Sequence, residues 1–316
     1  MRQYAAKRIV LFLPTVLLIT VIVFVVMRLV PGDPALAILS EGDAPYTQED
    51  LANLRAELGT DRHIATQYFV WIGGAVRGQF GDSLWFEAPV MRELQDRIPV
   101  TLELAVMAVI IAVVIAIPFG VISAIKPDSP IDYGARIFTL VGIAVPNFIV
   151  AVALMLLLVR FGGLAPLGYE KLWDDPLTNL HQLIFPALAL AFYNMAFIAR
   201  VTRSSMMEIL REDFMRTARA KGLGERVVVV RHGLKNAMLP ILTTSGWQFG
   251  RLFGGTVVIE TIFLVPGMGK ILIDAIGHRD YPMIQAEILI IGVAIVTINL
   301  LVDLLYGVMD PRIRYA

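Results

Sequence analysis

The sequence predicts an all-α integral membrane protein with six transmembrane helices and a small helical subdomain in its largest loop. Its 316 residues are 57% hydrophobic and only 17% charged, and the mean hydropathy of +0.71 lies outside the range of ordinary soluble proteins. Apolar stretches recur along the chain that are long enough to cross a hydrocarbon core of about 30 Å, which takes roughly 20 helical residues. These observations indicate a multi-pass membrane protein.

The predicted spans follow one another from the N-terminus. They cover residues 9–30, 101–125, 133–159, 182–199, 239–265 and 283–309. The first span follows Arg2, Lys7 and Arg8 as a signal peptide would, but its apolar run of about 22 residues exceeds the roughly 7 to 15 of a signal core. We therefore expect a retained anchor, preceded by a short segment at 1–8 and matched by a C-terminal tail at 310–316.

The Lys and Arg residues of the connections predict the orientation in the membrane. The connection 200–238 holds nine basic residues against four acidic ones, whereas the loop 31–98 holds five basic against eleven acidic. Because basic loops are retained in the cytoplasm, 200–238 is predicted to be cytoplasmic and 31–98 external. Six spans then place both termini in the cytoplasm.

Two helical patterns lie in the external loop 31–98. Thr47 is placed to cap the first helix, which should end near Gly59. The apolar positions of the two patterns are Leu51, Leu54 and Leu58, and then Val90, Leu94 and Ile98. We expect a small helical subdomain resting on the membrane or on neighbouring spans, either as an amphipathic cover or as a surface with a ligand role.

Glycines and polar residues inside the spans mark packing and a candidate solute path. Gly246, Gly250 and Gly254 share one helix face, which would allow close approach of a neighbouring helix or partner subunit, or would line the path. Polar groups in the spans should face protein or water and are our candidate lining. They are Asn147, Asn194, Gln248, Arg251, Glu260, Asn299 and Asp303.

Local chemistry refines this set of polar residues. Pro146, next to Asn147, removes a backbone hydrogen bond and predicts a kink in the third span. Arg251 and Glu260 are nine residues apart and would lie on nearly opposite faces of a continuous helix, so each needs its own partner or an aqueous boundary. Asn299 and Asp303 are four residues apart and share a face.

No catalytic or metal site is readable in the sequence. The chain has no cysteine, the four histidines lack any paired metal-ligand spacing, and the formal net charge of zero argues against nucleic acid as a partner. Gly267-Met-Gly-Lys270 departs from a phosphate loop at Leu264 and Ile271. Ser123-Ala-Ile-Lys126 matches a nucleophile pattern without its companion motifs. We predict no cofactor on this chain and no enzymatic activity.

The connection 200–238 contains a short helix that predicts a docking function. Asp213 is placed to cap it, and Gly222 is suited to end it in a left-handed conformation. Phe214, Thr217, Ala218 and Lys221 are spaced to share a face. A helix of about nine residues is marginal alone, so its order should come from docking. Arg216, Arg219 and Lys221 also suit anionic lipid headgroups, and these residues alone do not choose lipid or protein.

This segment resembles the cytoplasmic loop of ABC importer permeases, which has Glu-Ala-Ala, three residues, Gly, and later Leu-Pro. Here it reads Arg-Thr-Ala-Arg-Ala-Lys-Gly at 216–222, followed by Leu239-Pro240. Arg216 and Thr217 depart from the general pattern, and the stretch before Leu239-Pro240 is longer than in sugar permeases. Both departures are typical of the dipeptide, oligopeptide and nickel branch.

Further motifs along the chain resemble the same branch. They are Arg-Leu-Val-Pro-Gly-Asp-Pro at 28–34, Glu-Thr-Ile-Phe with Pro-Gly-Met-Gly at 260–269, Arg-Asp-Tyr-Pro at 279–282 and Asp-Pro-Arg-Ile-Arg-Tyr at 310–315. The similarity runs the length of the chain and is to the first permease subunit of a peptide importer. Segments 232–238 and 281–287 are similar to the glutathione-type subgroup.

The resemblance implies a type I importer in a bacterial inner membrane. Its partners would be a second, homologous permease, two cytoplasmic ATPases that bind ATP and Mg²⁺, an external solute-binding protein and membrane lipid. Residues 99–309 would form the permease core with five spans, and Asp213 to Gly222 would be the coupling helix seated on an ATPase. Short peptides are the expected substrate, with nickel chelates or another small solute as the alternative. A secondary transporter, a membrane enzyme and an export or signalling scaffold fit the sequence less well.

Overall fold

The structure, a computed structural model, describes residues 2–29, 35–36, 39, 46–57, 59–162 and 167–309. Within these ranges the regular elements are helices, and an isolated bridge joins Asp82 to Pro89. The helices are α1 (Arg2–Leu29), α3 (Gln48–Glu57), α4 (Ile64–Val76), α5 (Val90–Ile125), α6 (Pro130–Ala144), α7 (Asn147–Gly162), α8 (Pro176–Ile209), α9 (Asp213–Ala220), α10 (Glu225–Val227), the π-helix η1 (Val228–Leu234), α11 (Lys235–Gly255), α12 (Val257–Phe263), α13 (Met268–Gly277) and α14 (Tyr281–Met309). The predicted tail motif at 310–315, and the 30–34 part of the motif at 28–34, lie outside the described residues.

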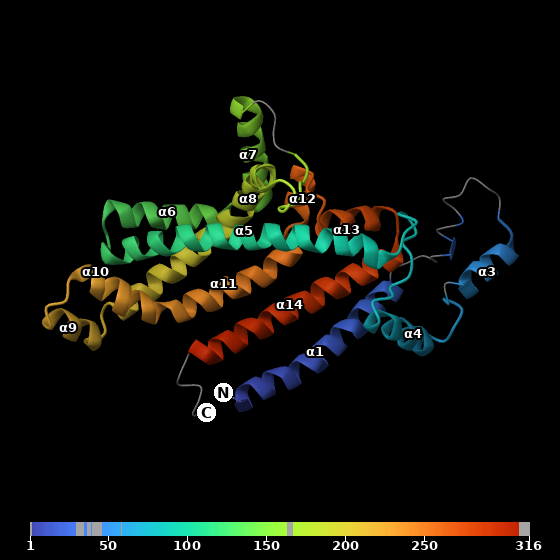
Figure 1. Ribbon diagram of the computed structural model, residues 1–316, viewed down its shortest axis with the longest axis horizontal. Helices are drawn as coiled ribbons and strands as arrows, with labels where there is room; N and C mark the ends of the chain where they lie inside the picture. The colour runs from blue at the N-terminus through green and yellow to red at the C-terminus, as the bar shows by residue number, and fades with distance from the viewer. Residues whose placement is uncertain are drawn as a thin grey trace.

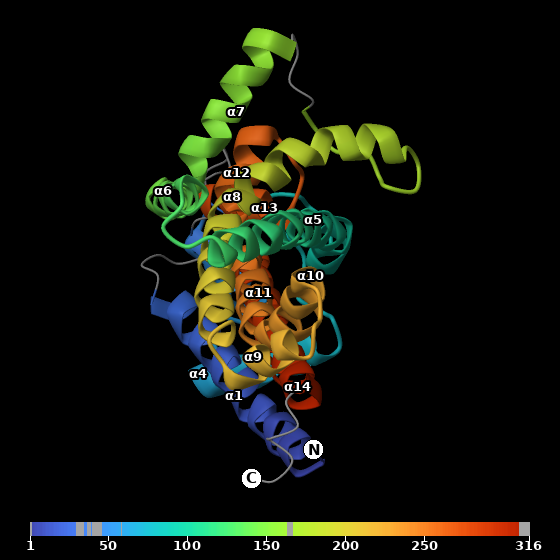
Figure 2. The ribbon, with the colours of Figure 1, turned by 90° about the vertical axis from the view of Figure 1, so that its left-hand side faces the viewer.

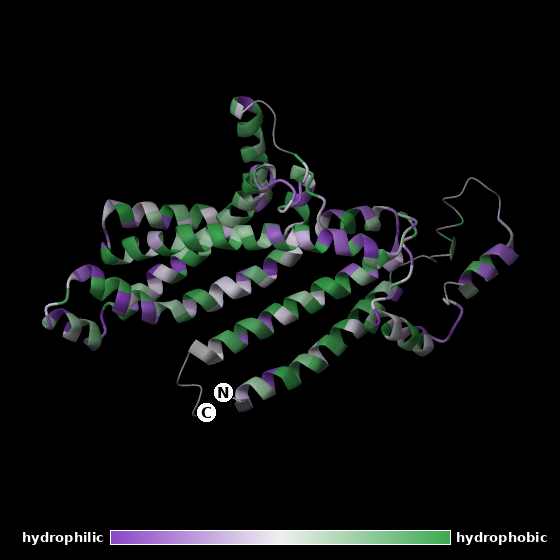
Figure 3. Cartoon of the chain, viewed as in Figure 1, coloured by the Kyte–Doolittle hydropathy of each residue, from purple (hydrophilic) through white to green (hydrophobic). Residues whose placement is uncertain are grey.

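The all-α membrane class is confirmed, but the count of six spans is not reached. Four described helices, α1, α5, α8 and α14, are long and apolar enough to cross a membrane, and the bent pair α6 and α7 raises the number to five. The segment expected as the fifth span is the helix α11, which is 21 residues long but carries many polar side chains. Figure 3 shows that the long helices are largely hydrophobic, with hydrophilic patches towards the α9 end and on α3.

The kink predicted at Pro146 is confirmed and is sharper than expected. Helix α6 ends at Ala144, α7 begins at Asn147, and the two axes meet at 102°. Residues 133–159 are therefore not one continuous span. Proline donates no backbone hydrogen bond and disfavours helical geometry in the residue before it, so the helix stops at this point. Figure 2 shows α7 extending away from the main body.

Several helices run beyond their predicted ends. Helix α5 begins at Val90, so the amphipathic pattern predicted for the external loop forms the first turns of a 36-residue helix. Helix α8 continues to Ile209, and α11 begins at Lys235, which shortens the connection expected at 200–238. The sequence underestimated these lengths because a hydropathy window ends where charges begin, although charged residues are good helix formers.

The core lies between α5 and α8, where small side chains allow the two helices to approach closely. Ala108, Ala112 and Ala116 recur at four-residue intervals on α5 and are fully or almost fully buried. Gly120 continues this stripe, and a Cβ atom there would lie 2.7 Å from the carbonyl oxygen of Ala199 on α8. Small residues at this spacing permit such contact between helices in a membrane.

The segment before α5 is fastened to the turn between α13 and α14. Ser83 donates a hydrogen bond to the Asp280 carboxylate, and the Trp85 ring stacks on His278 with centroids 3.4 Å apart. The predicted cap of α3 is also present, because the backbone N–H of Asp50 donates to Thr47 Oγ1 at 3.1 Å. Figure 1 shows α9 and α10 at one end of the molecule and α3 and α4 towards the other.

Candidate functional site

The helix α9 is held in place by apolar contacts within its own connection. Met215 and Ala218 are buried and pack with Val228 of η1, and Ile209 and Leu210 lie against the same cluster. These contacts supply the order that a helix of 8 residues lacks in isolation. The prediction that Ala218 shares an outward docking face is wrong, since Ala218 is only 6% exposed and faces its own chain.

The two ends of α9 differ in how well the sequence predicted them. Gly222 has φ of +75°, so the predicted left-handed ending is confirmed. Asp213 does not cap the helix: the N-cap is Glu212, without a side-chain hydrogen bond, and Asp213 is the first helical residue. The Asp213 carboxylate instead lies 3.5 Å from Arg216, and both side chains are exposed.

A charged pair closes the connection between α9 and α10. Arg219 donates from Nε at 3.1 Å and from an Nη atom at 2.9 Å to the Glu225 carboxylate. The guanidinium lowers the pKa of Glu225 below its ordinary value. This exposed ion pair links the two short helices and adds to the apolar contacts that hold α9.

The remaining residues predicted for coupling form an exposed surface at the end of the molecule. Phe214 is 42% exposed although it is a large apolar side chain. Its exposed neighbours on α9 and just beyond are Asp213, Arg216, Thr217, Arg219 and Lys221. The structure therefore presents one aromatic group surrounded by charged and polar side chains, supported from below by Met215 and Ala218.

Two of the predicted path residues meet in one cavity at the bend between α6 and α7. Asn147 and Arg251 both line this cavity of about 360 Å³, together with Tyr193 of α8 and Val258 and Ile259 of α12. Arg251 lies over the rings of Tyr193 and Trp247, at 5.6 and 5.2 Å from their centroids. A cationic group held between aromatic faces can bind a carboxylate or another polar solute.

Asn194 and Gln248 are buried in the helix bundle. The Asn194 side chain donates to the backbone oxygen of Leu190 on its own helix at 3.0 Å. Gln248 is 1% exposed, and its Nε2 has no hydrogen-bond partner within the described part of the chain. Neither residue lines the cavity at Asn147.

Glu260 does not line a path in this structure. It is fully buried, accepts a hydrogen bond from the Thr101 hydroxyl at 2.8 Å and accepts another from the backbone N–H of Lys270 at 3.0 Å. A Cβ atom at Gly267 would lie 2.4 Å from its carboxyl carbon. Glu260 therefore joins α5, α12 and α13, and it lies on α12, which is separate from the helix of Arg251.

Asn299 and Asp303 also lie away from the cavity at Asn147. Both line a smaller cavity between α1 and α14. The Asp303 carboxylate forms an ion pair with Arg8 of α1 at 2.9 Å. Through this ion pair, Asp303 links the first and last membrane helices.

The glycine stripe on α11 faces α14 over part of its length. A Cβ atom at Gly246 would lie 2.3 Å from a methyl carbon of Val302, whereas one at Gly250 would have ordinary contacts with Asn299 and Ile298 at 3.6 and 3.7 Å. A Cβ atom at Gly254 would meet no described atom within 4 Å. The stripe therefore provides close helix contact at Gly246 and open space at Gly254.

Sequence reasoning missed an ion-pair cluster where α5, α6 and α8 meet. Asp132 is fully buried and accepts from Arg203 Nε at 2.6 Å, from Ser123 at 2.6 Å and from Arg136 at 2.6 Å. Arg203 and Asp132 are 71 residues apart in sequence, so no local spacing signals the contact. The cluster ties the ends of three helices together on the α9 side of the molecule.

Comparisons with known proteins agree with this architecture. Residues 116–315 match the family described as binding-protein-dependent transport system inner membrane component, and residues 1–105 match the N-terminal family of the same membrane components. The methionine ABC transporter MetNI in an inward-facing conformation shares the fold, with a TM-score of 0.56 at 17% identity over 70% of this chain and 97% of that chain.

Relatives with assigned roles match over nearly the whole chain. The oligopeptide transport system permease protein AppB of Bacillus subtilis is 40% identical over all of both chains. The dipeptide transport system permease protein DppB of Escherichia coli is 39% identical over all of this chain and 99% of that protein. A putative peptide transport system permease protein of Brucella abortus is 40% identical over 98% of each. The chain belongs to the family of inner membrane components of binding-protein-dependent transport systems.

Proposed function

We propose that this chain is one permease subunit of an ATP-driven importer for short peptides. The observation that carries the proposal is the match, over nearly the full length, to permeases named for peptide, oligopeptide and dipeptide transport. A second permease completes the path, two ATPases bind ATP and Mg²⁺, and a solute-binding protein delivers the substrate. The chain lies in a bacterial inner membrane with α9 and both termini in the cytoplasm.

The surface around Phe214 is the contact with an ATPase. An exposed aromatic side chain ringed by polar groups is typical of an interface anchor. Met215 and Ala218 hold α9 against Val228, so a displacement of the helix moves the connection with it. Since α8 is unbroken up to Ile209, the displacement reaches the membrane helices, and rotation of packed helices opens the path to either side in turn.

The cavity at Asn147, Tyr193 and Arg251 is the part of the path that this chain contributes. A peptide has a carboxylate and amide groups, which suit a guanidinium, a phenol and a carboxamide. Arg251 is exposed, so its guanidinium is available to a solute without breaking a buried ion pair. Val258 and Ile259 supply an apolar wall for side chains.

The experiment replaces Phe214 by Ala in the complete transporter reconstituted into vesicles. We expect ATP-dependent dipeptide uptake to fall by more than about tenfold, because a central aromatic anchor contributes about 2 kcal/mol or more to an interface. Phe161→Ala is the matched control, since Phe161 at the end of α7 is 81% exposed and the helix α7 lies far from α9 (Figure 1). It should leave uptake unchanged.

Two results would contradict the proposal. Normal ATP-dependent uptake by the Phe214→Ala variant would refute the role of this surface, provided that the ATPase still copurifies with the wild-type chain. Uptake of a nickel chelate but of no di- or oligopeptide, by the wild-type transporter with its cognate binding protein, would refute the substrate class.

A further inference from the structure

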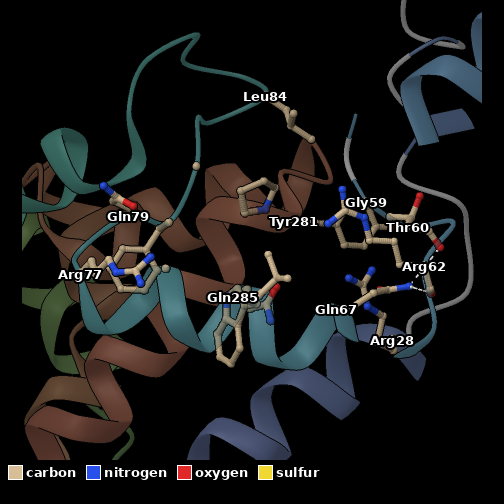
Figure 4. A pocket seen from close by; sticks show the side chains of 16 residues that line it. Arg28, Gly59, Thr60, Arg62, Gln67, Arg77, Gln79, Leu84, Tyr281 and Gln285 are labelled. Atoms are coloured by element: carbon tan, nitrogen blue, oxygen red, sulfur yellow. Dashed lines mark hydrogen bonds between the residues drawn. The ribbon is translucent and has the colours of Figure 1, made fainter. Parts of the chain in front are cut away.

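A cationic cavity lies at the opposite end of the molecule from α9 and shares no lining residue with the cavity at Asn147. It has a volume of about 470 Å³ and is lined by the end of α1, the turn before α4, α4 itself, the segment 77–84 and the start of α14. Arg28, Arg62 and Arg77 line it, together with Gln67 and Gln285 (Figure 4). No Asp or Glu is among its described lining residues.

Local contacts position two of the three arginines, Arg28 and Arg62. The Arg28 guanidinium lies 5.2 Å from the centroid of the Phe24 ring. Gln67 donates from Nε2 to the backbone oxygens of Thr60 at 3.1 Å and Arg62 at 2.7 Å, which fixes the turn that carries Arg62. No ion pair joins Arg28, Arg62 or Arg77 to an acidic residue in the described ranges.

The position of α4 places this cavity at a membrane surface. The Tyr68 hydroxyl of α4 is 2.8 Å from the Thr20 hydroxyl of α1, and the Tyr68 ring meets Phe24 edge-on at 5.4 Å. Thr20 lies within the apolar part of α1, about 12 Å before Arg28 at 1.5 Å per residue. Helix α4 therefore runs beside the membrane-spanning part of α1.

The face of α4 that points away from α1 is apolar. Phe69 and Val76 are 70% and 82% exposed, and α4 has no buried residue. An apolar helix next to a membrane span, with Trp71 and Tyr281 nearby in the cavity wall, is typical of the interface between hydrocarbon and headgroups. The arginines thus face the depth at which lipid phosphates lie.

We propose that this cavity binds the headgroup of an anionic phospholipid in the leaflet opposite α9. Arginine forks are suited to the oxygens of a phosphodiester, and basic recesses between membrane helices bind anionic headgroups. Gln67 Oε1 is buried and has no described partner, so it can accept a hydrogen bond from a headgroup hydroxyl such as that of glycerol. The acyl chains would then lie along the exposed face of α4.

The test is native mass spectrometry of the full-length chain in its transporter assembly, released from nanodiscs containing phosphatidylglycerol or phosphatidylethanolamine. The wild type should retain phosphatidylglycerol preferentially. Replacing Arg28, Arg62 and Arg77 by Gln should lower this preference by about fivefold per residue, on the order of a hundredfold in total. Arg92→Gln is the matched control, because Arg92 is exposed on the first turn of α5 and does not line the cavity.

Other outcomes would overturn the proposal. Equal retention of both lipids by the wild type would exclude a headgroup site, as would an unchanged preference in the triple variant. Stronger binding of free glycerol phosphate or of a dipeptide than of phosphatidylglycerol would assign the cavity to a soluble anion. If the triple Gln variant fails to assemble, the Arg→Lys variants at the same positions keep the charge, and they should retain part of the preference. The proposal does not depend on which solute is transported.

Discussion

The close contact between Gly246 and Val302 predicts that a single methyl group at residue 246 destabilises the pairing of α11 with α14. In a helix interior, Gly→Ala alone stabilises by about 0.5–1 kcal/mol because the unfolded chain loses freedom. At Gly246 the new Cβ atom would lie 2.3 and 3.0 Å from the two Val302 methyl carbons and 3.2 Å from its Cβ atom. Val302 is β-branched and strongly prefers one rotamer in a helix, so it cannot turn away.

The magnitude follows from these opposing effects. Overpacking of this kind costs about 1–3 kcal/mol, so Gly246→Ala should lower the free energy of unfolding by about 1–2 kcal/mol net. Gly250→Ala makes only ordinary contacts at 3.6 and 3.7 Å, and Gly254→Ala meets no atom of the described residues within 4 Å. Both should therefore be neutral or slightly stabilising, although all three changes have the same helix propensity.

The assay is thermal unfolding of the purified chain in detergent, with the three variants compared side by side. The double variant Gly246→Ala with Val302→Ala should recover stability relative to the sum of the single changes, with a coupling of about 0.5–3 kcal/mol. Equal melting temperatures for the Gly246 and Gly254 variants, or no coupling to Val302, would refute the assignment of Gly246 to this contact.

Further predictions concern the connection around α9 and the cluster at Asp132. Asp132→Asn should lower the free energy of unfolding by about 3–5 kcal/mol, because it removes a buried carboxylate and leaves Arg203 unpaired. Thermal unfolding in detergent measures this change, and an unchanged melting temperature would contradict the prediction. Ala218→Leu should loosen α9 by crowding Met215 and Val228, seen as faster hydrogen exchange across α9 even without an ATPase present. Gly222→Ala should destabilise the connection around α9 by about 1–2 kcal/mol, because residue 222 has a positive φ. Gly224→Ala should not destabilise it, since φ there is −60°. The rates at which a protease cleaves the connection in the two variants test this difference. Because Arg219 lowers the pKa of Glu225, the ion pair stabilises the α9 connection fully above the ordinary glutamate pKa of about 4.3. This stabilisation is lost as the pH falls through the lowered pKa. Glu225→Gln should abolish the resulting pH dependence of hydrogen exchange in α9.

Local signals in the sequence predicted the features that depend on local chemistry. Pro146 interrupts the helix because of its own ring and missing donor, and Gly222 ends α9 because only glycine adopts a positive φ freely. Both positions were identified from neighbouring residues. The four-residue stripe of Ala108, Ala112, Ala116 and Gly120 is not among the sequence predictions, although small residues at this spacing indicate close helix contact.

Features that depend on tertiary contacts were not predictable in the same way. The side of α9 that faces its own chain was decided by Val228, which lies on the far side of the turn at Gly222. The sequence predicts a path role for Glu260 because a carboxylate in a span needs polar surroundings. In the structure its partners are the Thr101 hydroxyl, 159 residues away, and the backbone N–H of Lys270 in the first turn of α13.

Under the proposed function, Asp132 and Arg203 would carry movement at α9 to the cavity at Asn147. Arg203 and Tyr193 lie on α8, and the stretch between them has neither proline nor glycine, so they are joined by about 15 Å of regular helix. Asp132 lies in the first turn of α6, whose other end leads to the bend at Asn147. The ion pair therefore ties two walls of the cavity, at Tyr193 and Asn147, to the same point, and they should move together. Arg251 lies on α11, which follows α9 in the chain through the π-helix η1 and also packs on α8 and α14. Under the proposed function, we expect transport to change the distance between Arg251 and those two walls.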